Sequence, residues 1–234
     1  MCGRFSQFSD VETIADRYDA HTDIVTLTPQ YNLAPGMDAA IVVGGEIRRR
    51  LICMRWGLIP SWAKDSAIAY RLINARGETA AEKPSFRGAL KHRRCLVPAD
   101  GFFEWSGPKG RRQPWFFHAA NGELLAFAGL WEQWQPPDGG SALQTFAILT
   151  TAAAGSIAEI HDRMPVIVGA AAHAAWLGAG PMTSGDLDDL IAAHHDAALS
   201  RYRVSTVVNT ARNNTAACIA PAPEPSELGG MNTP

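Results

Sequence analysis

The 234-residue sequence lacks several features that would assign it to a broad class of proteins. No apolar run is long enough to span a membrane, and the segment after Met1 lacks the apolar core of a secretory signal peptide. No CxxC pair occurs among the four cysteines, which argues against a zinc site or a redox motif. We therefore expect a cytoplasmic protein without a membrane association, in which Cys53, Cys95 and Cys218 are buried, reduced thiols.

The sequence also lacks an excess of positive charge. It holds 21 Lys and Arg against 23 Asp and Glu, which gives a formal net charge of −2. Nucleic-acid-binding domains are often strongly basic, but the position of each cation matters more than the total. Basic runs at residues 48–50, 91–94 and 109–112 are more often solvated surfaces than binding sites, whereas Trp62 near Lys64 combines a stacking surface with a cation, as single-stranded nucleic acid requires.

One α+β domain is expected over residues 1–219, because strand-like segments dominate and few of them alternate with helices. Its sheet should be mostly antiparallel and curved or barrel-like, with helices at the periphery. The Pro- and Gly-rich residues 220–234 are predicted to form a disordered tail. Predicted helices cover residues 10–18, 152–160, 170–177 and 184–195, and predicted strands cover residues 39–43, 46–55, 94–97, 115–118, 123–130, 144–150, 164–168 and 201–208.

Local signals add detail to this outline. Ser9 and Glu12 have the spacing of a capping box at the start of the first helix. Gly44-Gly45 and Asn121-Gly122 each predict a hairpin between the strands on either side. Residues 20–38 show no clear periodicity and are expected to form a loop.

Cys2 is the first residue with distinctive chemistry. Removal of Met1, which is usual when the second residue is small, leaves an amine and a thiol on the same residue. The pKa of an α-amine is about 8, against about 10.4 for lysine, so far more of this amine is unprotonated near neutral pH. Such a 1,2-aminothiol condenses with an aldehyde to an imine, and the thiol then closes a five-membered thiazolidine. From its position alone, Cys2 is still better interpreted as an ordinary terminal residue.

Three further segments carry polar groups capable of chemistry. Asn74 and Arg76 in LINARGET can hydrogen-bond a substrate and bind a phosphate, although a capped turn before a helix explains them equally well. Glu104 stands among aromatic residues, which would raise its pKa if it is buried, but a strand could also turn it toward water. His161 in EIHDRMPVIV can exchange protons near neutral pH, as can any accessible histidine.

Taken together, these segments resemble the SRAP family, also called SOS response-associated peptidases or abasic-site processing proteins. The resemblance extends over about residues 2 to 219. Gln30, and RNNTAAC at residues 212–218, depart from the usual pattern of the family, which puts fine DNA contacts in doubt. The matching segments are MCGRF at 1–5, YNLAP at 31–35, RWGLIPSW at 55–62, INARGET at 73–79, CLVPADGFFEW at 95–105, ILTTAAA at 148–154, IHDRMPVIV at 160–168 and VSTVVN at 204–209.

The resemblance implies a single β-rich domain with a basic cleft that binds single-stranded DNA containing abasic sites. It implies that Cys2 forms a thiazolidine with the ring-opened sugar, that Asn74 orients the terminal amine, and that Glu104 and His161 transfer protons. Met1 would be removed by the protein itself, and a weak strand-nicking lyase activity would result from the imine. A monomer without a cofactor, located on the nucleoid when bound to DNA, is expected. The residues implied in DNA binding are Arg4, Pro35, Trp62, Arg76, Trp105, Thr150 and Arg163.

Two other functions are compatible with the same residues. Cys2, His161 and Asn74 are the residue types of a thiol protease, so the protein could cleave other proteins. A thiol protease would tolerate a blocked terminal amine, whereas thiazolidine chemistry would not. A non-catalytic reader of modified or single-stranded DNA would bind tightly without Cys2 and form no covalent product.

Overall fold

The computed structural model describes residues 2–108, 110–193 and 198–223. No helix in these ranges is long and apolar enough to cross a membrane. The strands are β1 (Phe5–Gln7), β2 (Ala20–Thr22), β3 (Gln30–Leu33), β4 (Asp38–Val43), β5 (Arg49–Trp56), β6 (Asn74–Arg76), β7 (Arg94–Ala99), β8 (Gly101–Ser106), β9 (Gln113–Ala119), β10 (Leu125–Trp134), β11 (Leu143–Ala152), β12 (Arg163–Pro165) and β13 (Leu199–Arg203). The α-helices are α1 (Val11–Tyr18), α2 (Gly77–Ala80), α3 (Arg87–His92), α4 (Gly155–Ala158), α5 (His173–Leu177) and α6 (Ser184–Ala193), and the 3-10 helices are η1 (Ser66–Arg71), η2 (Ala170–Ala172), η3 (Thr206–Asn209) and η4 (Ala216–Cys218).

Five strands of the larger sheet close into a barrel, in the order β11, β10, β7, β4, β5 and back to β11. Four of the five pairings are antiparallel, and the pairing of β5 with β11 is parallel. An odd number of strands cannot alternate in direction all the way around a ring, so one parallel pairing is unavoidable. The predicted α+β domain with a mostly antiparallel, barrel-like sheet is confirmed.

A second, fully antiparallel sheet lies against the barrel and has the order β13, β9, β8, β1, β3. Phe5 of β1 and Phe102 of β8 pair directly and join the same buried cluster as Trp56 of the barrel. The three rings are fully buried, and the Phe5 and Trp56 rings meet edge to face at 5.1 Å. The amino-terminal strand is therefore anchored between the two sheets by aromatic packing.

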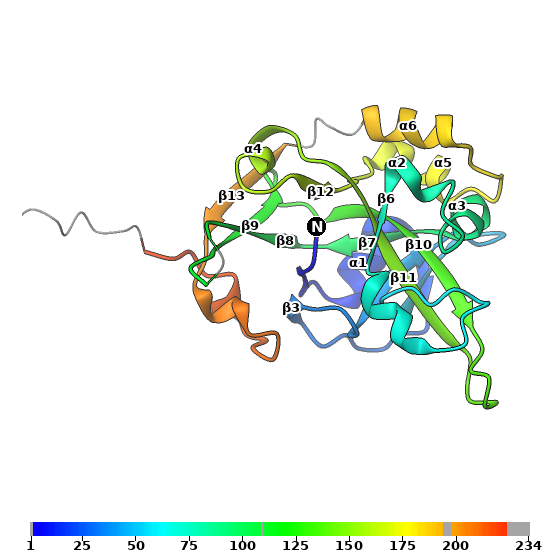
Figure 1. Ribbon diagram of the computed structural model, residues 1–234. Helices are drawn as coiled ribbons and strands as arrows, with labels where there is room; N and C mark the ends of the chain where they lie inside the picture. The colour runs from blue at the N-terminus through cyan, green and yellow to red at the C-terminus, as the bar shows by residue number, and fades with distance from the viewer. Residues whose placement is uncertain (1, 109, 194–197, 224–234) are drawn as a thin grey trace, which may run out of the picture.

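Strand β4 of the barrel is apolar on both faces because both of its faces are covered. In β4, Ile41 and Val43 belong to the cluster that faces the second sheet, whereas Ala40 and Val42 belong to the cluster under the helices. Figure 1 shows α2, α5 and α6 gathered on one side of the molecule, away from β13 and β9. This arrangement explains why the segment DAAIVV is a continuous apolar run with no polar alternation.

The first helix begins one residue later than the capping box predicts. Asp10 is the N-cap, and its carboxylate accepts a hydrogen bond from Thr13 N at 2.7 Å. Ser9 instead donates from its hydroxyl to Asp100, which also accepts from the backbone of Phe8 and Ser9. The turn before α1 is thus held by Asp100 from the β7–β8 connection, a contact that no local pattern reveals.

The hairpin predicted around Gly44-Gly45 is confirmed, with a longer connection than expected, whereas the other hairpin prediction and one loop prediction are wrong. β9 and β10 flank Asn121-Gly122 but belong to different sheets, so the turn connects the sheets instead of pairing two strands. β4 and β5 do pair, but residues 44–48 join them, because β5 starts at Arg49. Residues 20–38 contain β2 and β3, which are short edge strands of the two sheets.

The remaining differences concern lengths and burial. The helix predicted at 152–160 is reduced to α4, the helix predicted at 170–177 is split into η2 and α5, and the strand predicted at 164–168 shortens to β12. The strand predicted at 201–208 ends at Arg203, where η3 follows. Cys95 and Cys218 are buried as predicted, but Cys53 is exposed because it lies on the outer face of β5. The predicted helix end at 194–195 and most of the predicted tail lie outside the described residues.

Arg94, expected on a solvated surface, is 5% exposed and serves as a bridge between helices. Its guanidinium lies over the ring of Trp176 and donates only to backbone carbonyls. These carbonyls terminate α3 and α5, where the helix dipoles favour a cation. The acceptors are the carbonyl oxygens of Leu90, Lys91, Trp176, Gly178 and Gly180.

We expect Arg94→Met to lower the free energy of unfolding by about 3 kcal/mol, because it leaves several buried carbonyls without donors. Arg87→Met removes an exposed cation from α3 and should change the free energy by less than about 0.5 kcal/mol. Urea unfolding of both variants at pH 7 measures the difference. Equal effects of the two substitutions would contradict the bridging role.

Candidate active site

Cys2 is completely buried between the two sheets. Burial raises the pKa of its thiol far above the usual value, and the nearby Glu104 carboxylate raises it further. The backbone N–H of Arg4 acts in the opposite direction, but with a smaller effect. The sulfur is therefore held as a neutral thiol at physiological pH, close to the Glu104 carboxyl group.

Asn74 lies at the start of β6, which pairs in parallel with β11 through Ile148. Its side-chain amide donates to the carbonyl oxygen of Cys2 at 2.8 Å. The resemblance implies that Asn74 orients the terminal amine, and the structure places its amide on the carbonyl of Cys2 instead. This bond fixes the backbone of Cys2 relative to the barrel.

Glu104 is 3% exposed, which rules out the alternative that it faces water. Strand alternation places it on the same face of β8 as Phe102, toward the cluster that contains Cys2, while Phe103 packs on the other face. Burial raises the pKa of this carboxyl to about 8, with Asp162 adding to the rise and Arg112 opposing it. Glu104 is consequently protonated for the most part at pH 7 and can act as an acid.

His161 is placed beside Glu104 by the turn that leads into β12. Its Nε2 lies 3.8 Å from Glu104 Oε2, and its Nδ1 accepts the backbone N–H of Arg163 at 2.9 Å. Asp162 Oδ1 is also 2.8 Å from Nδ1, a contact that is a hydrogen bond whenever Nδ1 carries a proton. Burial lowers the pKa of His161, so the neutral ring prevails at pH 7. The bond from the Arg163 N–H favours the tautomer with the proton on Nε2, the nitrogen nearest to Glu104.

Arg163 and Thr150, both predicted to contact DNA, are bonded to each other. Arg163 Nη2 donates to the carbonyl oxygen of the fully buried Thr150 at 2.8 Å. The same guanidinium makes a two-point ion pair with Glu78 at 2.6 and 2.8 Å. Most of the donors of Arg163 are thus occupied within the protein.

Arg4 and Trp105 lie together at the edge of the second sheet. The guanidinium of Arg4 is 6.0 Å from the centre of the Trp105 ring and donates to Asn32 Oδ1 and to the carbonyl of Val208. The indole N–H of Trp105 donates to Asn209 Oδ1 at 2.7 Å. Arg4 therefore fixes the start of the chain to η3, and Asn209 fixes the orientation of the Trp105 ring.

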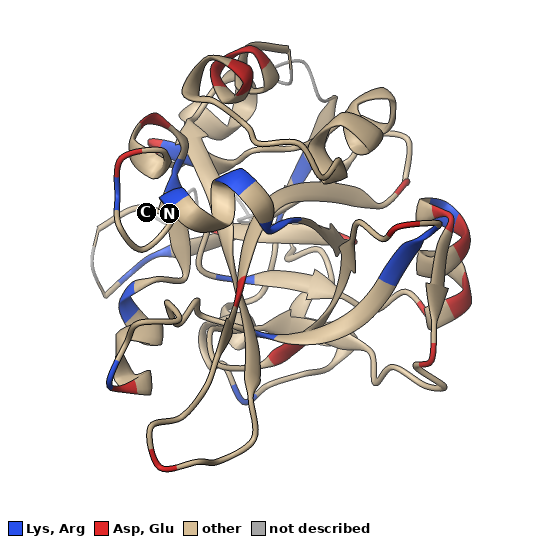
Figure 2. Ribbon diagram, turned by 90° about the vertical axis from the view of Figure 1, so that its right-hand side faces the viewer, with Lys and Arg blue, Asp and Glu red and all other residues tan. Residues whose placement is uncertain are grey.

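The other predicted DNA contacts are not joined to the four central residues by any hydrogen bond or ion pair among the described residues. Arg76 is exposed beside Glu78, Trp62 is 59% exposed in the loop before η1, and Pro35 is half-buried after β3. Figure 2 shows Lys and Arg spread over many elements and interspersed with Asp and Glu. In this view, Lys and Arg do not gather on a single basic face.

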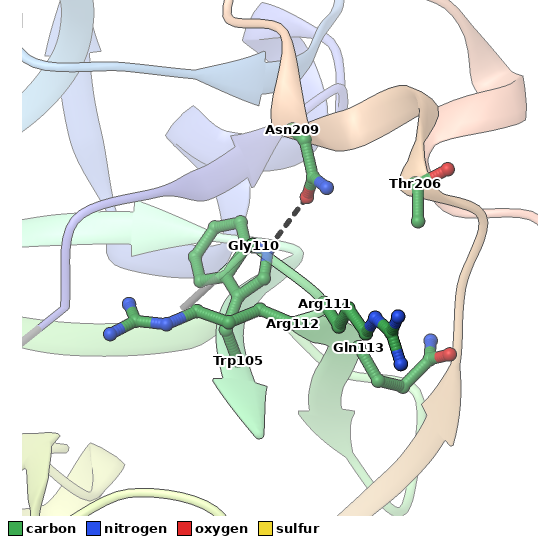
Figure 3. A pocket seen from close by; sticks show the side chains of 7 residues that line it. All are labelled: Trp105, Gly110, Arg111, Arg112, Gln113, Thr206 and Asn209. Atoms are coloured by element: carbon green, nitrogen blue, oxygen red, sulfur yellow. Dashed lines mark hydrogen bonds between the residues drawn. The ribbon is translucent and has the colours of Figure 1, made fainter. Parts of the chain in front are cut away.

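A pocket with a volume of about 610 Å³ opens beside Trp105, between the β8–β9 connection and η3. The indole forms one wall, and Arg111 and Arg112 come from the connection between the strands (Figure 3). None of the described residues that line the pocket carries a carboxylate. These residues are Trp105, Gly110, Arg111, Arg112, Gln113, Thr206 and Asn209.

Known proteins resemble this chain in sequence over most of its length. Residues 1–211 match the family described as SOS response associated peptidase (SRAP). The chain belongs to the SRAP family. Abasic site processing protein YoqW of Bacillus subtilis is 39% identical over 92% of this chain and 97% of its own length, and abasic site processing protein HMCES of Xenopus tropicalis is 35% identical over 82% of this chain and 66% of its own length.

Solved SRAP-like structures support the fold. A crystal structure of a Bacteroides thetaiotaomicron protein superposes with a TM-score of 0.82 over 94% of this chain and 100% of that chain, at 24% identity, which supports the fold alone. A phage-related protein from Bordetella bronchiseptica, at 28% identity, has a TM-score of 0.68 over 87% of this chain and 94% of that chain. Both crystal structures therefore share the fold of this SRAP protein over most of its length.

Three residues of the site are not apparent from the sequence, although each lies in a segment that resembles the family. Asn32 in YNLAP holds Arg4, Glu78 in INARGET holds Arg163, and Asn209 in VSTVVN holds Trp105. They act through other side chains, so no local pattern identifies them. Among the described residues, no group of three or more His, Cys, Asp or Glu side chains could hold a metal ion.

We expect Glu104→Gln to change how stability depends on pH. In the folded SRAP protein the pKa of Glu104 is about 8, above its ordinary value of 4.5, so between these values the folded state holds a proton that the unfolded state has lost. The free energy of unfolding of the wild type should therefore fall, relative to the variant, by up to about 1.4 kcal/mol per pH unit as the pH rises through this range.

Urea unfolding at several pH values between 4.5 and 8.5 measures this difference. Both proteins must carry the same amino-terminal residue, confirmed by intact mass, so that all other titrating groups cancel. A wild type that gains stability over Glu104→Gln as the pH rises would mean that the folded state depresses the pKa of Glu104.

Proposed function

We propose that this protein processes abasic sites in single-stranded DNA by forming a covalent thiazolidine between Cys2 and the aldehyde of the opened sugar. The observation that carries the proposal is the meeting of Cys2 with Asn74, Glu104 and His161 in one buried site. The names of the relatives, abasic site processing proteins, agree with this chemistry.

The reaction begins with hydrolysis of the Met1–Cys2 peptide bond, which releases methionine and frees the amine of Cys2. We propose that the protein performs this step itself. Asn74 supports this role, because its bond to the Cys2 carbonyl holds the adjacent peptide in a fixed position. The thiol of Cys2 is the nucleophile closest to this bond, and Glu104 is close enough to influence its protonation.

The proton transfers that follow depend on the protonation states in which Glu104 and Cys2 start. Glu104 starts as the acid form and protonates the ring oxygen of the sugar while the C1′ hydroxyl proton passes to solvent, so the ring opens to the aldehyde and Glu104 is left as a carboxylate. The amine of Cys2 adds to the aldehyde carbon, and the hydroxyl of the adduct takes a proton from solvent and leaves as water, which gives the protonated imine. The thiol sulfur then bonds to the imine carbon, its proton passes to the Glu104 carboxylate, and the imine nitrogen becomes the ring amine of the thiazolidine.

His161 complements Glu104 in these steps. Its Nε2 lies 3.8 Å from Glu104 Oε2, so a proton on Nε2 stabilises by its charge the carboxylate that forms after the first proton transfer. Hydrolysis of the imine reverses the linkage. Loss of a proton from C2′ of the imine would instead cleave the strand by β-elimination, which accounts for the expected weak lyase activity.

The flanking strand would pass the pocket beside Trp105. A flat indole and two cations without a neighbouring carboxylate in the described lining match a base and its phosphate. Arg111 and Arg112 form no ion pair with any described residue, so they are available for phosphates, whereas Arg163 is paired with Glu78 and Nη1 of Arg4 is bonded to Asn32 and Val208. Arg112 also influences the protonation of Glu104 and His161, which places it near the reacting groups.

The purified protein, mixed with a single-stranded oligonucleotide that bears one abasic site, should form an adduct that survives heating and denaturing electrophoresis. Intact mass should show loss of Met1 and addition of the oligonucleotide minus one water. Cys2→Ser, prepared with Met1 removed and its new terminus confirmed by intact mass, keeps the amine and should form only an imine that borohydride traps. Cys53→Ser removes an exposed cysteine and should leave the adduct unchanged.

A protein whose Cys2 amine is acetylated and whose thiol is intact separates the proposal from a thiol protease. It should form no adduct, whereas cleavage of other proteins would persist in a protease. An undamaged oligonucleotide provides the blank. Absence of a stable adduct from protein that begins at Cys2, with tight DNA binding retained, would instead favour a non-catalytic reader.

The double variant Arg111→Gln/Arg112→Gln should bind single-stranded DNA more weakly and with less dependence on salt. Loss of two phosphate contacts should reduce the slope of log K against log salt by about 1.4, at about 0.7 per phosphate on a single strand. Fluorescence anisotropy with an oligonucleotide that carries a tetrahydrofuran analogue, which has no aldehyde, measures binding alone. Arg50→Gln/Arg87→Gln removes two exposed cations elsewhere and should change the slope little; equal slopes for the two double variants would place the strand outside the pocket.

A further inference from the structure

The ion pair between Glu78 and Arg163 is the best-formed surface pair near the site. Arg163 Nη1 and Nη2 donate to the two oxygens of Glu78 at 2.6 and 2.8 Å, which is the two-point geometry of a strong guanidinium–carboxylate contact. Arg163 is only 15% exposed, and Glu78 is 48% exposed. The bond to Arg163 lowers the pKa of Glu78, so the pair is ionised at neutral pH.

The pair connects the two segments that bring the polar groups to Cys2. Glu78 lies in α2, directly after β6, which starts with Asn74. Arg163 begins β12, two residues after His161. Both strands pair with β11, and Arg163 adds a hydrogen bond to the carbonyl of Thr150 in that strand.

The backbone of Arg163 also influences the tautomer of His161. The backbone N–H of Arg163 donates to His161 Nδ1 and so favours the neutral ring with its proton on Nε2, whereas the Asp162 carboxylate, 2.8 Å from the same Nδ1, favours the opposite tautomer. Nε2 is the nitrogen that lies 3.8 Å from Glu104. A shift of the backbone at Arg163 would release Nδ1, and the ring could then take the other tautomer, with no proton to donate to Glu104.

We propose that Glu78 is a positioning residue: through its two-point ion pair with Arg163 it holds the turn that places His161 and favours its tautomer with the proton on Nε2. The inference rests on the proposed function, since the group that it positions acts in that reaction. Glu78 does not face the reacting atoms itself. Its effect passes through the Arg163 side chain to the Arg163 backbone and from there to the imidazole ring.

A different role for the same contact would be masking of Arg163. If DNA displaced Glu78 to reach the guanidinium, the carboxylate would oppose binding. The geometry favours the positioning role, because Arg163 Nη2 is also bonded to the Thr150 carbonyl, and Thr150 lies fully buried in the barrel. The Arg163 guanidinium therefore connects β11 to α2.

The decisive comparison is Glu78→Gln against wild type in two assays. With saturating protein and an abasic single-stranded oligonucleotide, the rate of adduct formation should fall about tenfold, since small displacements of reacting groups cost this much or more. Affinity for the tetrahydrofuran oligonucleotide should change less than about twofold, because one uncharged residue replaces a carboxylate that contacts no DNA. Glu78→Asp retains the charge on a shorter side chain and should recover part of the rate.

Glu123→Gln is the matched control. Glu123 pairs with Arg17 on the surface at 2.6 Å and is 51% exposed, so its loss removes an ion pair of the same kind away from Cys2. The Glu123→Gln variant should equal the wild type both in the rate of adduct formation and in affinity for the tetrahydrofuran oligonucleotide. If Glu78→Gln reacts as fast as Glu123→Gln, or binds DNA several-fold more tightly than wild type, the positioning role is wrong.

Nitrogen-15 shifts of the His161 ring give a readout that needs no reaction. The wild type should show the neutral form with the proton on Nε2, and Glu78→Gln should show a mixture of tautomers. An unchanged ring spectrum in Glu78→Gln would overturn the inference even if the adduct forms normally. Failure of the wild type to form an adduct would count against the proposed function, while the ring spectra would still decide the role of Glu78.

Discussion

Strand β11 is the element on which both the fold and the site depend. It pairs with β10 along most of its length, with β5 in the parallel pairing that closes the barrel, and with β6 and β12 near its carboxyl end. These last two strands carry Asn74 and Arg163, and the turn before β12 carries His161. The pairings of this one strand therefore both close the barrel and bring the polar groups to Cys2.

Burial supplies the chemical character of the site. Cys2 and Glu104 are enclosed by the aromatic residues that join the two sheets, and both are held in their neutral forms because charge is poorly solvated there. The same packing that stabilises the fold thus determines the protonation states with which the chemistry begins.

Local patterns in the sequence were enough to predict part of the fold and the site. The apolar strands of the barrel, helix α1 and the α+β class were accessible from periodicity, and the resemblance to the SRAP family identified the segments around Cys2, Asn74, Glu104 and His161. Bonds between distant segments were not accessible. The assignment of β9 and β10 to different sheets depends on partners far away along the chain, namely β8 and β13 for one and β7 and β11 for the other.

Single residues show the same limit. Arg94 belongs to a basic run that is typical of a solvated surface, but the ends of two helices converge on it and bury it. Cys53 belongs to an apolar strand, but it falls on the exposed face of β5. The two asparagines of RNNTAAC, which depart from the family pattern, prove structural: Asn214 accepts from the backbone of Tyr31, and Asn213 donates to the carbonyl of Val207.

The bond from Arg4 to the carbonyl of Val208 joins residues 204 positions apart in the chain. During synthesis β1 emerges well before its partner in η3. Asn32, which also binds Arg4, likewise donates to the carbonyls of Val208, Thr210 and Asn213. The segment around Cys2 is consequently secured only after residues 208–213 have been made, so a chain that stops before them does not present an assembled site.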